Sequence, residues 1–341
     1  MKLLMVGADS NYAIERFYFK YFSAMPMASQ VSFFKAQNKF LTYYNQSLIN
    51  KVWYRVGFST VLKKINDELT SFIEEKSPDI IFVFKGMEIL PQTLKWAKER
   101  KIKLVNYNPD NPFYFSGKGS GNRNITQSLT LYDLHFTYNQ EVKNKIDKDF
   151  GIATAILPFG FELSEEEYSI AERQTEIIKT CFLGNPDAHR AKFIMTLAKK
   201  GVLIDVFGHN WKKFISHENI TANDTVYGLD FWKTLRKYRV QLNLMRPHNL
   251  QSHNMRSFEI PAVGGVMLAP DTPDHQSFFD KRSEVFLFKS KDNCVHLIDV
   301  LLKKNTPEID EIRKCARDRS IKSRYSYKDR CEQVVGQLIK L

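Results

Sequence analysis

An arginine and a glutamate stand three residues apart in the stretch "NMRSFEIPAVGGVMLAPDT", which runs from Asn254 to Thr272. In a helix this spacing places Arg256 and Glu259 on one face. A guanidinium binds phosphate oxygens in a bidentate manner, and a carboxylate accepts hydrogen bonds from two neighbouring hydroxyls. The helix start adds N–H donors, and the pair Gly264 and Gly265 permits a tight turn into the next strand. The stretch therefore suits a ligand such as a nucleoside diphosphate.

Other polar turns follow apolar runs in the same half of the chain. "LGNPDAHR" ends one run, "FGHNW" ends a second, and "VQLNLMR" leads into the polar loop "PHNLQSHN". In an open parallel sheet, ligands bind at the carboxyl ends of the strands. We therefore expect these turns to form one site together with the helix that carries Arg256.

Short apolar runs alternate with helical segments along the chain, as is typical of parallel sheets covered on both faces. The predicted strands span residues 3–8, 30–36, 79–86, 102–108, 134–139 and 154–160, then 177–185, 202–208, 240–245, 266–270 and 284–289. The 341 residues exceed the usual size of one domain, and an acidic, polar stretch follows Gly160. We predict an α/β fold of two Rossmann-like doubly wound domains, residues 1–160 and 161–325, that face a cleft.

Taken together, "NMRSFEIPAVGGVMLAPDT", "LGN…R", "FGHNW" and "LNLMR" resemble the donor domain of the CgeB (spore maturation protein) family. Its members are GT-B glycosyltransferases related to the retaining group with an E-x7-E motif. The specific resemblance spans Lys179 to Lys289, and the first 160 residues are similar only to a general GT-B acceptor domain. The resemblance implies two domains, with a last helix, residues 326–341, that returns to the N-terminal domain.

The resemblance also implies roles for single residues. Glu259 would bind the ribose of a nucleotide-sugar donor, and Arg190 would face its diphosphate. Arg256, which the side-chain chemistry already assigns to phosphate oxygens, would join Arg190 in stabilising the leaving diphosphate during catalysis. The first glutamate of the motif is replaced by Gln251, which together with His253 would lie on the sugar or acceptor side; this replacement leaves the retaining outcome open. The other donor-side candidates are Gly184, Asn185, Gly208, His209, Asn254, Ser257, Gly264 and Gly265.

The N-terminal half offers acceptor-side candidates. Asp9, Ser10 and Asn11 follow the first predicted strand, where they would face the cleft. The loop 107–122 combines aromatic residues, glycines and Asp110; aromatic rings pack on sugar rings, and a carboxylate accepts hydrogen bonds from hydroxyls. Asp110 is therefore our third catalytic candidate. Two structural alternatives remain, because Asp9 could cap the next helix and Asp110 could serve only a turn.

Composition narrows the classes of ligand. The net charge is +12, and the basic excess is spread over both halves, with 21 Lys+Arg against 14 Asp+Glu up to Gly160 and 29 against 24 beyond it. Such a charge suits anionic ligands. The sequence does not, however, show the clustered basic residues that are typical of nucleic-acid-binding proteins. The four cysteines show no zinc-ligand spacing, and no DxD pair ends a donor-domain strand. We therefore expect no metal or other cofactor.

The apolar run from Leu3 to Val6 is too short for a signal peptide, and no run approaches a membrane span. We expect a cytoplasmic protein, with peripheral membrane association left open. The aromatic segment 40–58 could face a membrane, but we interpret it as core and acceptor-side surface.

The predicted function is transfer of a hexose-type sugar from a nucleoside-diphosphate-sugar to a hydroxyl of a surface glycan, glycolipid or glycoprotein. The alternatives are a GT-B-fold sugar-nucleotide epimerase, a non-catalytic nucleotide- or glycan-binding protein, and, from the charge alone, a nucleic-acid-binding protein.

Overall fold

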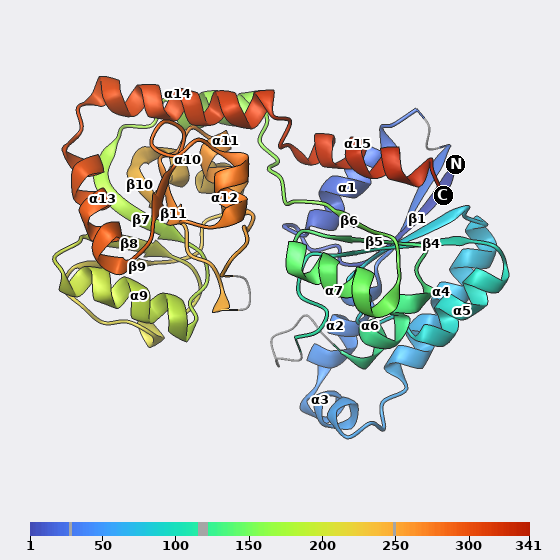
Figure 1. Ribbon diagram of the computed structural model, residues 1–341. Coiled ribbons are helices and arrows are strands. Elements are labelled where there is room, and N and C mark those ends of the chain that lie inside the picture. Colours follow the sequence, from blue (N-terminus) through green and yellow to red (C-terminus); the bar gives the residue numbers. More distant parts are fainter. Residues whose placement is uncertain (27–28, 115–121, 248–249) are drawn as a thin grey trace. The chain divides into compact units, whose positions relative to one another are not determined.

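The computed structural model describes residues 1–26, 29–114, 122–247 and 250–341 (Figure 1). The chain divides into two compact units, one formed by Met1–Pro158 with Tyr327–Leu341 and the other by Phe159–Ser326; the predicted boundaries lay after residues 160 and 325. Each unit contains a six-stranded parallel sheet with helices packed on it. The predicted fold class of two Rossmann-like domains is confirmed.

The first unit has the sheet order β2-β1-β3-β4-β5-β6. Its strands are β1 (Lys2–Val6), β2 (Gln30–Phe34), β3 (Ile80–Phe84), β4 (Lys103–Asn108), β5 (Leu134–Thr137) and β6 (Thr154–Ile156). Its helices are α1 (Ile14–Ser23), α2 (Ala36–Gln46), α3 (Leu48–Arg55), α4 (Val61–Lys76), α5 (Pro91–Glu99), α6 (Arg123–Ser128), α7 (Gln140–Phe150) and α15 (Tyr327–Leu338), with a 3-10 turn at Leu129–Leu131.

The sequence of β3, "IIFVF", explains why the first sheet is covered on both faces. Side chains alternate across a strand. Ile81 and Val83 pack in the aliphatic core with α4 and α5, whereas Phe82 and Phe84 contact Tyr18 of α1. All five strand residues are buried. The last helix belongs to the second of these layers, since the Tyr327 ring lies 5.8 Å from the Tyr18 ring.

The second unit has the sheet order β12-β11-β10-β7-β8-β9. Its strands are β7 (Ile177–Leu183), β8 (Ile204–Phe207), β9 (Ile220–Asn223), β10 (Tyr238–Leu242), β11 (Met267–Pro270) and β12 (Phe286–Phe288). Its helices are α8 (Glu165–Glu172), α9 (Ala188–Lys199), α10 (Gly228–Lys237), α11 (Arg256–Ala262), α12 (Pro273–Phe278), α13 (Lys291–Lys303) and α14 (Thr306–Lys322), with a 3-10 turn at Trp211–Lys213. Helix α13 packs on β7, β10 and β12, while α10 packs on α8 and α11 on α14.

Strand order places one topological switch point in each unit. In the second unit β7 and β10 are neighbours, but the chain leaves β7 toward β8 and leaves β10 toward β11. In the first unit the corresponding neighbours are β1 and β3. The loops at the carboxyl ends of such strands diverge and leave room for a ligand.

Two further observations on the helices bear on the sequence-based expectations. Helix α3 buries none of its residues, so the interpretation of residues 40–58 as core is wrong for this helix. Within the described residues, no helix combines the length and apolar character that crossing a bilayer requires.

Two glycine substitutions test how tightly the strand ends are packed. A Cβ on Gly208, directly after β8, would lie 2.4 Å from the carbonyl oxygen of Gly184, directly after β7. Backbone cannot yield as a side chain can, so we expect Gly208→Ala to lower the free energy of unfolding by roughly 2–3 kcal/mol.

Gly336 is the matched control, because a Cβ there meets nothing within 4 Å in helix α15. Gly336→Ala should stabilise the protein by about 0.5–1 kcal/mol. Chemical denaturation measures both changes, and equal stability of Gly208→Ala and wild type would contradict the packing described here.

Candidate functional site

Arg190 joins the two loops that diverge at the switch point of the second unit. Its Nε and Nη2 donate to the carbonyl oxygen of Leu244, after β10, at 3.2 and 2.8 Å. Its Nη1 donates to the carbonyl oxygen of Asn185, after β7, at 3.2 Å. Asp187 caps α9 by accepting the Arg190 backbone N–H, which places the arginine in the first turn. The buried guanidinium thus fixes the spacing between the two loops.

Arg190 is charged but desolvated. Burial lowers its pKa to about 10; Asp187 opposes this effect, and the nearby cations Arg246 and Arg256 add to it. A guanidinium has five N–H groups, and three nitrogens donate to the protein as described. Arg190 therefore acts first as a positioning residue, with N–H capacity left for an anion.

Arg256 and Glu259 lie beside these two loops. Arg256, at the start of α11, donates from Nε to the carbonyl oxygen of Leu183 at 3.2 Å. Its Nη1 forms an ion pair with Glu259, and its guanidinium lies over the Phe231 ring at 4.3 Å. The Arg256 side chain is 29% exposed and that of Glu259 is 10% exposed. The pair is thus anchored to the end of β7 and only partly open to solvent.

The predicted residues after β7 and β8 are brought together. The backbone N–H of His209 donates to Asn185 Oδ1 at 3.1 Å, and Trp211 Nε1 donates to the Gly184 carbonyl oxygen at 2.9 Å. His209 is exposed, with its Nε2 3.1 Å from the Tyr227 hydroxyl. Gly208 has no room for a side chain, because a Cβ there would collide with the Gly184 carbonyl group. Of this group, Asn185 and His209 present polar atoms near the loop surface.

Asn254 and Ser257, two predicted site residues, bond to each other at the start of α11, and their predicted role in donor binding stays untested. The Ser257 N–H donates to Asn254 Oδ1, and the Asn254 N–H donates to Ser257 Oγ, both at 3.1 Å. Ser257 Oγ also lies 2.8 Å from His275 Nε2, whose ring has Nδ1 at 2.8 Å from the Pro270 carbonyl oxygen. Burial lowers the pKa of His275 to about 4. The ring is therefore neutral at pH 7, with Nδ1 donating to the carbonyl and Nε2 accepting from Ser257.

His253 is buried rather than open to a ligand. Its side chain is 1% exposed, and Nδ1 lies 2.7 Å from Asp274 Oδ2. Aromatic rings surround it, including those of Phe258 and Phe278. Although burial raises the pKa of Asp274, hydrogen bonds from His253 and Ser252 bring it below its ordinary value. This geometry gives His253 a structural role, while its predicted role on the sugar side stays untested.

The remaining candidates of the second unit are Gln251, predicted on the sugar or acceptor side, and the donor-side pair Gly264 and Gly265. Gln251 is exposed; residues 248 and 249 of its loop lie outside the described part of the chain. Gly264 adopts φ +68° and turns the chain after α11, and a Cβ on Gly265 would meet Ile260 Cγ2 at 2.8 Å. Both glycines pack against protein atoms, so they shape the path from α11 to β11.

Arg246 is a site residue that the sequence analysis missed. It follows β10 in the quoted "LNLMR", is exposed, and lies close enough to lower the pKa of Arg190. Within the described residues it forms no hydrogen bond or ion pair. Three guanidinium groups, from Arg190, Arg246 and Arg256, therefore gather near two carboxylates, Asp187 and Glu259. The local excess of positive charge favours an anion.

In the first unit, the predicted acceptor-side residues follow β1. Asp9 forms ion pairs with Lys35 at 2.5 Å and Arg16 at 3.5 Å. Asn11 accepts from Arg16 Nη1 at 2.9 Å, and Ser10 is exposed. Asp9 does not cap α1, whose first turn has no side-chain cap. These residues form a polar surface at the carboxyl end of β1.

A charged cluster occupies the switch point of the first unit. Lys85, after β3, forms an ion pair with Asp110, after β4, at 2.7 Å. Burial lowers the pKa of Lys85, but Asp110 and the charges of Glu15 and Glu88 raise it above its ordinary value overall. Glu15 and Glu88 are buried. The cluster joins Asp110 to three charged groups that sequence analysis did not assign; residues 115–121 of the predicted acceptor loop lie outside the described residues.

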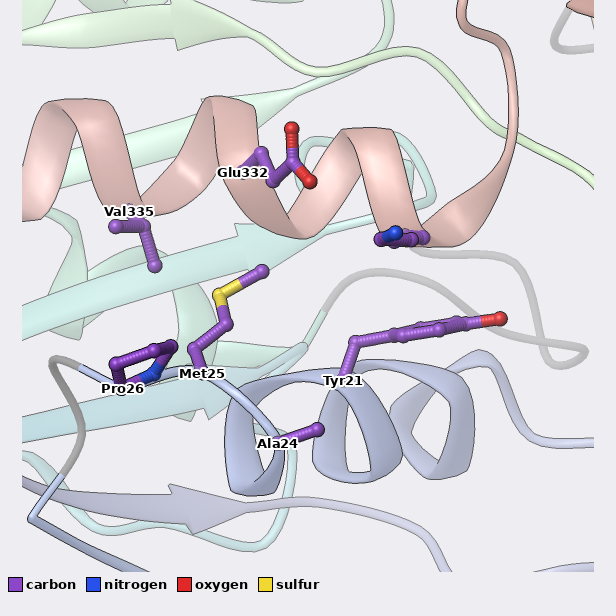
Figure 2. A pocket seen from close by; sticks show the side chains of 7 residues that line it. Tyr21, Ala24, Met25, Pro26, Glu332 and Val335 are labelled. Atoms are coloured by element: carbon purple, nitrogen blue, oxygen red, sulfur yellow. The ribbon is translucent and has the colours of Figure 1, made fainter.

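Figure 2 shows a hollow of about 450 Å³ between the end of α1 and α15, lined by Tyr21, Ala24, Met25, Pro26, Lys328, Glu332 and Val335. Helix α1 starts at the carboxyl end of β1 and runs back, so its end lies at the opposite edge of the sheet. The hollow is therefore separate from the switch point of the first unit. Among the described residues, no group of three or more His, Cys, Asp or Glu side chains could hold a metal ion.

Part of the second unit matches a known protein family. Residues 190–336 match a family described as glycosyl transferase-like. The match begins at Arg190 and includes the β8, β10 and α11 loops. No curated protein sequence is significantly similar to the chain.

Solved structures resemble the whole chain. Sucrose-phosphate synthase from Thermosynechococcus elongatus is 9% identical with a TM-score of 0.70, and the similarity covers 100% of this chain and 98% of that one. Anabaena HepE, solved with UDP, is 11% identical with a TM-score of 0.64 and full coverage of both chains. UDP-GlcNAc 2-epimerase from Neisseria meningitidis is 15% identical with a TM-score of 0.58, again over both full chains. The fold is that of GT-B glycosyltransferases.

Glu88 gives the first unit a testable pH dependence. Burial raises its pKa from 4.5 to about 7, against the opposing effects of a backbone hydrogen bond and Lys85. Because the folded pKa is the higher one, the stabilisation is complete below pH 4.5 and is lost as the pH rises through 7. We expect Glu88→Gln to remove up to about 3 kcal/mol of the stability difference between pH 5 and pH 8.

Urea denaturation at the two pH values measures this difference. Glu99→Gln, at an exposed position in α5, removes the same charge and should leave the pH dependence unchanged. An unaltered pH dependence in Glu88→Gln would show that Glu88 titrates normally in the folded protein.

Proposed function

We propose that the protein is a glycosyltransferase that moves a hexose-type sugar from a nucleoside-diphosphate-sugar to an acceptor hydroxyl. One observation carries the proposal: three arginines converge on the switch point of the second unit, where Arg256 pairs with the largely buried Glu259. This is where open α/β sheets bind nucleotides. The glycosyl transferase-like family match over the same loops supports it, as does the UDP in the structure of HepE.

The donor-side roles follow from the chemistry of the side chains. Arg246 is the cation with the greatest freedom to reach a diphosphate, and Arg256 can share its charge between Glu259 and the phosphate oxygens. Glu259 would accept hydrogen bonds from the ribose hydroxyls. Negative charge develops on the leaving diphosphate in the transition state, so fixed cations lower the barrier. Since guanidinium groups supply this charge, the proposed reaction needs no divalent metal.

The acceptor side rests on the first unit. Asp110 and the Asp9–Asn11 surface lie at the carboxyl ends of β4 and β1, where they could accept hydrogen bonds from the hydroxyls of a carbohydrate. Asp110 is the proposed catalytic carboxylate of this unit, and it forms an ion pair with Lys85. A surface glycan, glycolipid or glycoprotein fits such a polar surface. Retention of configuration is the stereochemical outcome that the family resemblance favours, while Gln251 in place of a glutamate leaves inversion open.

A second candidate is a sugar-nucleotide epimerase, which the similarity to UDP-GlcNAc 2-epimerase favours. An epimerase would convert the nucleotide-sugar without any acceptor. A transferase would release the nucleoside diphosphate and join the sugar to the acceptor. Incubation with nucleotide-sugars, with and without a glycan acceptor, followed by mass spectrometry and NMR of the products, distinguishes these reactions.

Nucleotide binding tests the donor site directly. In the presence of EDTA, one of UDP, GDP, dTDP or CMP should raise the melting temperature of the protein. Glu259→Gln keeps one acceptor oxygen but loses the charge, so we expect its affinity for that nucleotide to fall at least about tenfold. Isothermal titration calorimetry measures the change.

Glu218→Gln is the matched control, since Glu218 is exposed and precedes β9 at the opposite edge of the sheet. Its nucleotide affinity should equal that of the wild type. If none of the nucleotides binds, or if binding depends on a divalent metal, the proposed donor site is wrong.

A further inference from the structure

Helix α3 is attached to the first unit by one narrow side. Ser47 caps its start by accepting the Asn50 N–H at 3.0 Å, and Asn50 Nδ2 donates to the Tyr43 carbonyl oxygen at 2.8 Å. The Tyr54 ring lies 4.8 Å from the Phe40 ring of α2. Asn50 and Tyr54 are four residues apart and so share one helix side. Figure 1 shows α3 at the outer end of the unit.

The rest of the helix presents apolar side chains to solvent. We call these residues the α3 apolar face: Leu48, Ile49, Val52, Trp53 and Val56, continued by Phe58; they are 55% to 80% exposed. At about 100° per residue, the five positions from Leu48 to Val56 cover an arc of roughly 140°. Contiguous exposed apolar side chains of this kind mark an interaction surface rather than ordinary surface scatter.

The charges of the segment that carries this face all have one sign. Residues 30–66 contain six Lys and Arg and no Asp or Glu. Lys35 and Lys39 form ion pairs with Asp9 and Glu68. The other four are Lys51, Arg55, Lys63 and Lys64, which form no ion pair among the described residues. Lys51 and Arg55 lie next to Leu48 on the helix wheel, so cations border the apolar arc.

We propose that the α3 apolar face docks on an anionic lipid bilayer, with its apolar side chains inserted at the headgroup boundary and Lys51 and Arg55 on the lipid phosphates. Short helices with Trp, Phe and Leu on one side and basic residues beside them bind membranes in this way. A second copy of the chain is a poorer occupant, because a two-fold contact would bring the unpaired cations of both copies together.

Vesicle co-sedimentation tests the proposal without reference to enzymatic activity. The full chain should bind vesicles of phosphatidylcholine with 30% phosphatidylglycerol and bind pure phosphatidylcholine weakly. Lys51→Gln and Arg55→Gln should each reduce the partition coefficient roughly fivefold. The double variant Trp53→Ser, Phe58→Ser should reduce it at least about tenfold. Trp53 emission should shift to the blue on binding, a change absent in Trp53→Phe.

The matched control is the double variant Ile178→Ser, Leu203→Ser, which alters apolar residues of similar exposure in the other unit and should bind like wild type. Equal binding by the two double variants would overturn the proposal, as would the absence of binding to anionic vesicles. Self-association in sedimentation velocity that the Trp53→Ser, Phe58→Ser variant abolishes, without vesicle binding, would assign the face to a dimer instead.

Discussion

The second unit depends on one buried cation. At a switch point the chain leaves two neighbouring strands in opposite directions, so the loops that follow have no ladder of hydrogen bonds to set their separation. Arg190 supplies that constraint by donating to the carbonyl oxygens of Leu244 and Asn185. Burial of a charged group is costly unless it is hydrogen-bonded, and the cost here is offset by these bonds and by Asp187. The loops are therefore spaced before any ligand arrives.

The same arrangement leaves charge available for binding. Arg256 is engaged by Glu259 and by the Leu183 carbonyl, whereas Arg246 is exposed beside them. An incoming diphosphate would relieve the mutual repulsion of the three guanidinium groups. The hydroxyls of a ribose would donate hydrogen bonds to the Glu259 carboxylate. Within the described part of the chain, the switch point of the first unit has no such excess of cations. There Lys85 and Asp110 neutralise each other, and the buried Glu15 and Glu88 have raised pKa values.

The sequence predicts the strands of the fold more fully than the contacts that the candidate site residues make. Runs such as "IIFVF" identify buried parallel strands, because every second side chain meets a helix layer on the opposite face. Strand β9, "ITAN", was missed because it is short and half polar at the sheet edge. In the site, Arg256 and Glu259 could be recognised from helical spacing. The pairing of His253 with Asp274 and the hydrogen bond from Asn254 to Asn243 could not, since in both cases the two partners are distant in sequence. Arg246 belongs to the motif "LNLMR", but its position beside Arg190 depends on the fold and could not be recognised from the sequence.

The most direct test of this account is the preference of the protein for a diphosphate over a monophosphate. Calorimetric titration in EDTA with UDP, GDP and dTDP, each against its monophosphate, measures that preference. For the nucleotide that binds, the diphosphate should bind at least about tenfold more tightly. Arg246→Gln should remove most of the difference, whereas Arg173→Gln, at the exposed end of α8, should preserve it. Equal affinity for diphosphate and monophosphate in the wild type, or an unchanged preference in Arg246→Gln, would contradict a diphosphate site at the β7–β10 switch point.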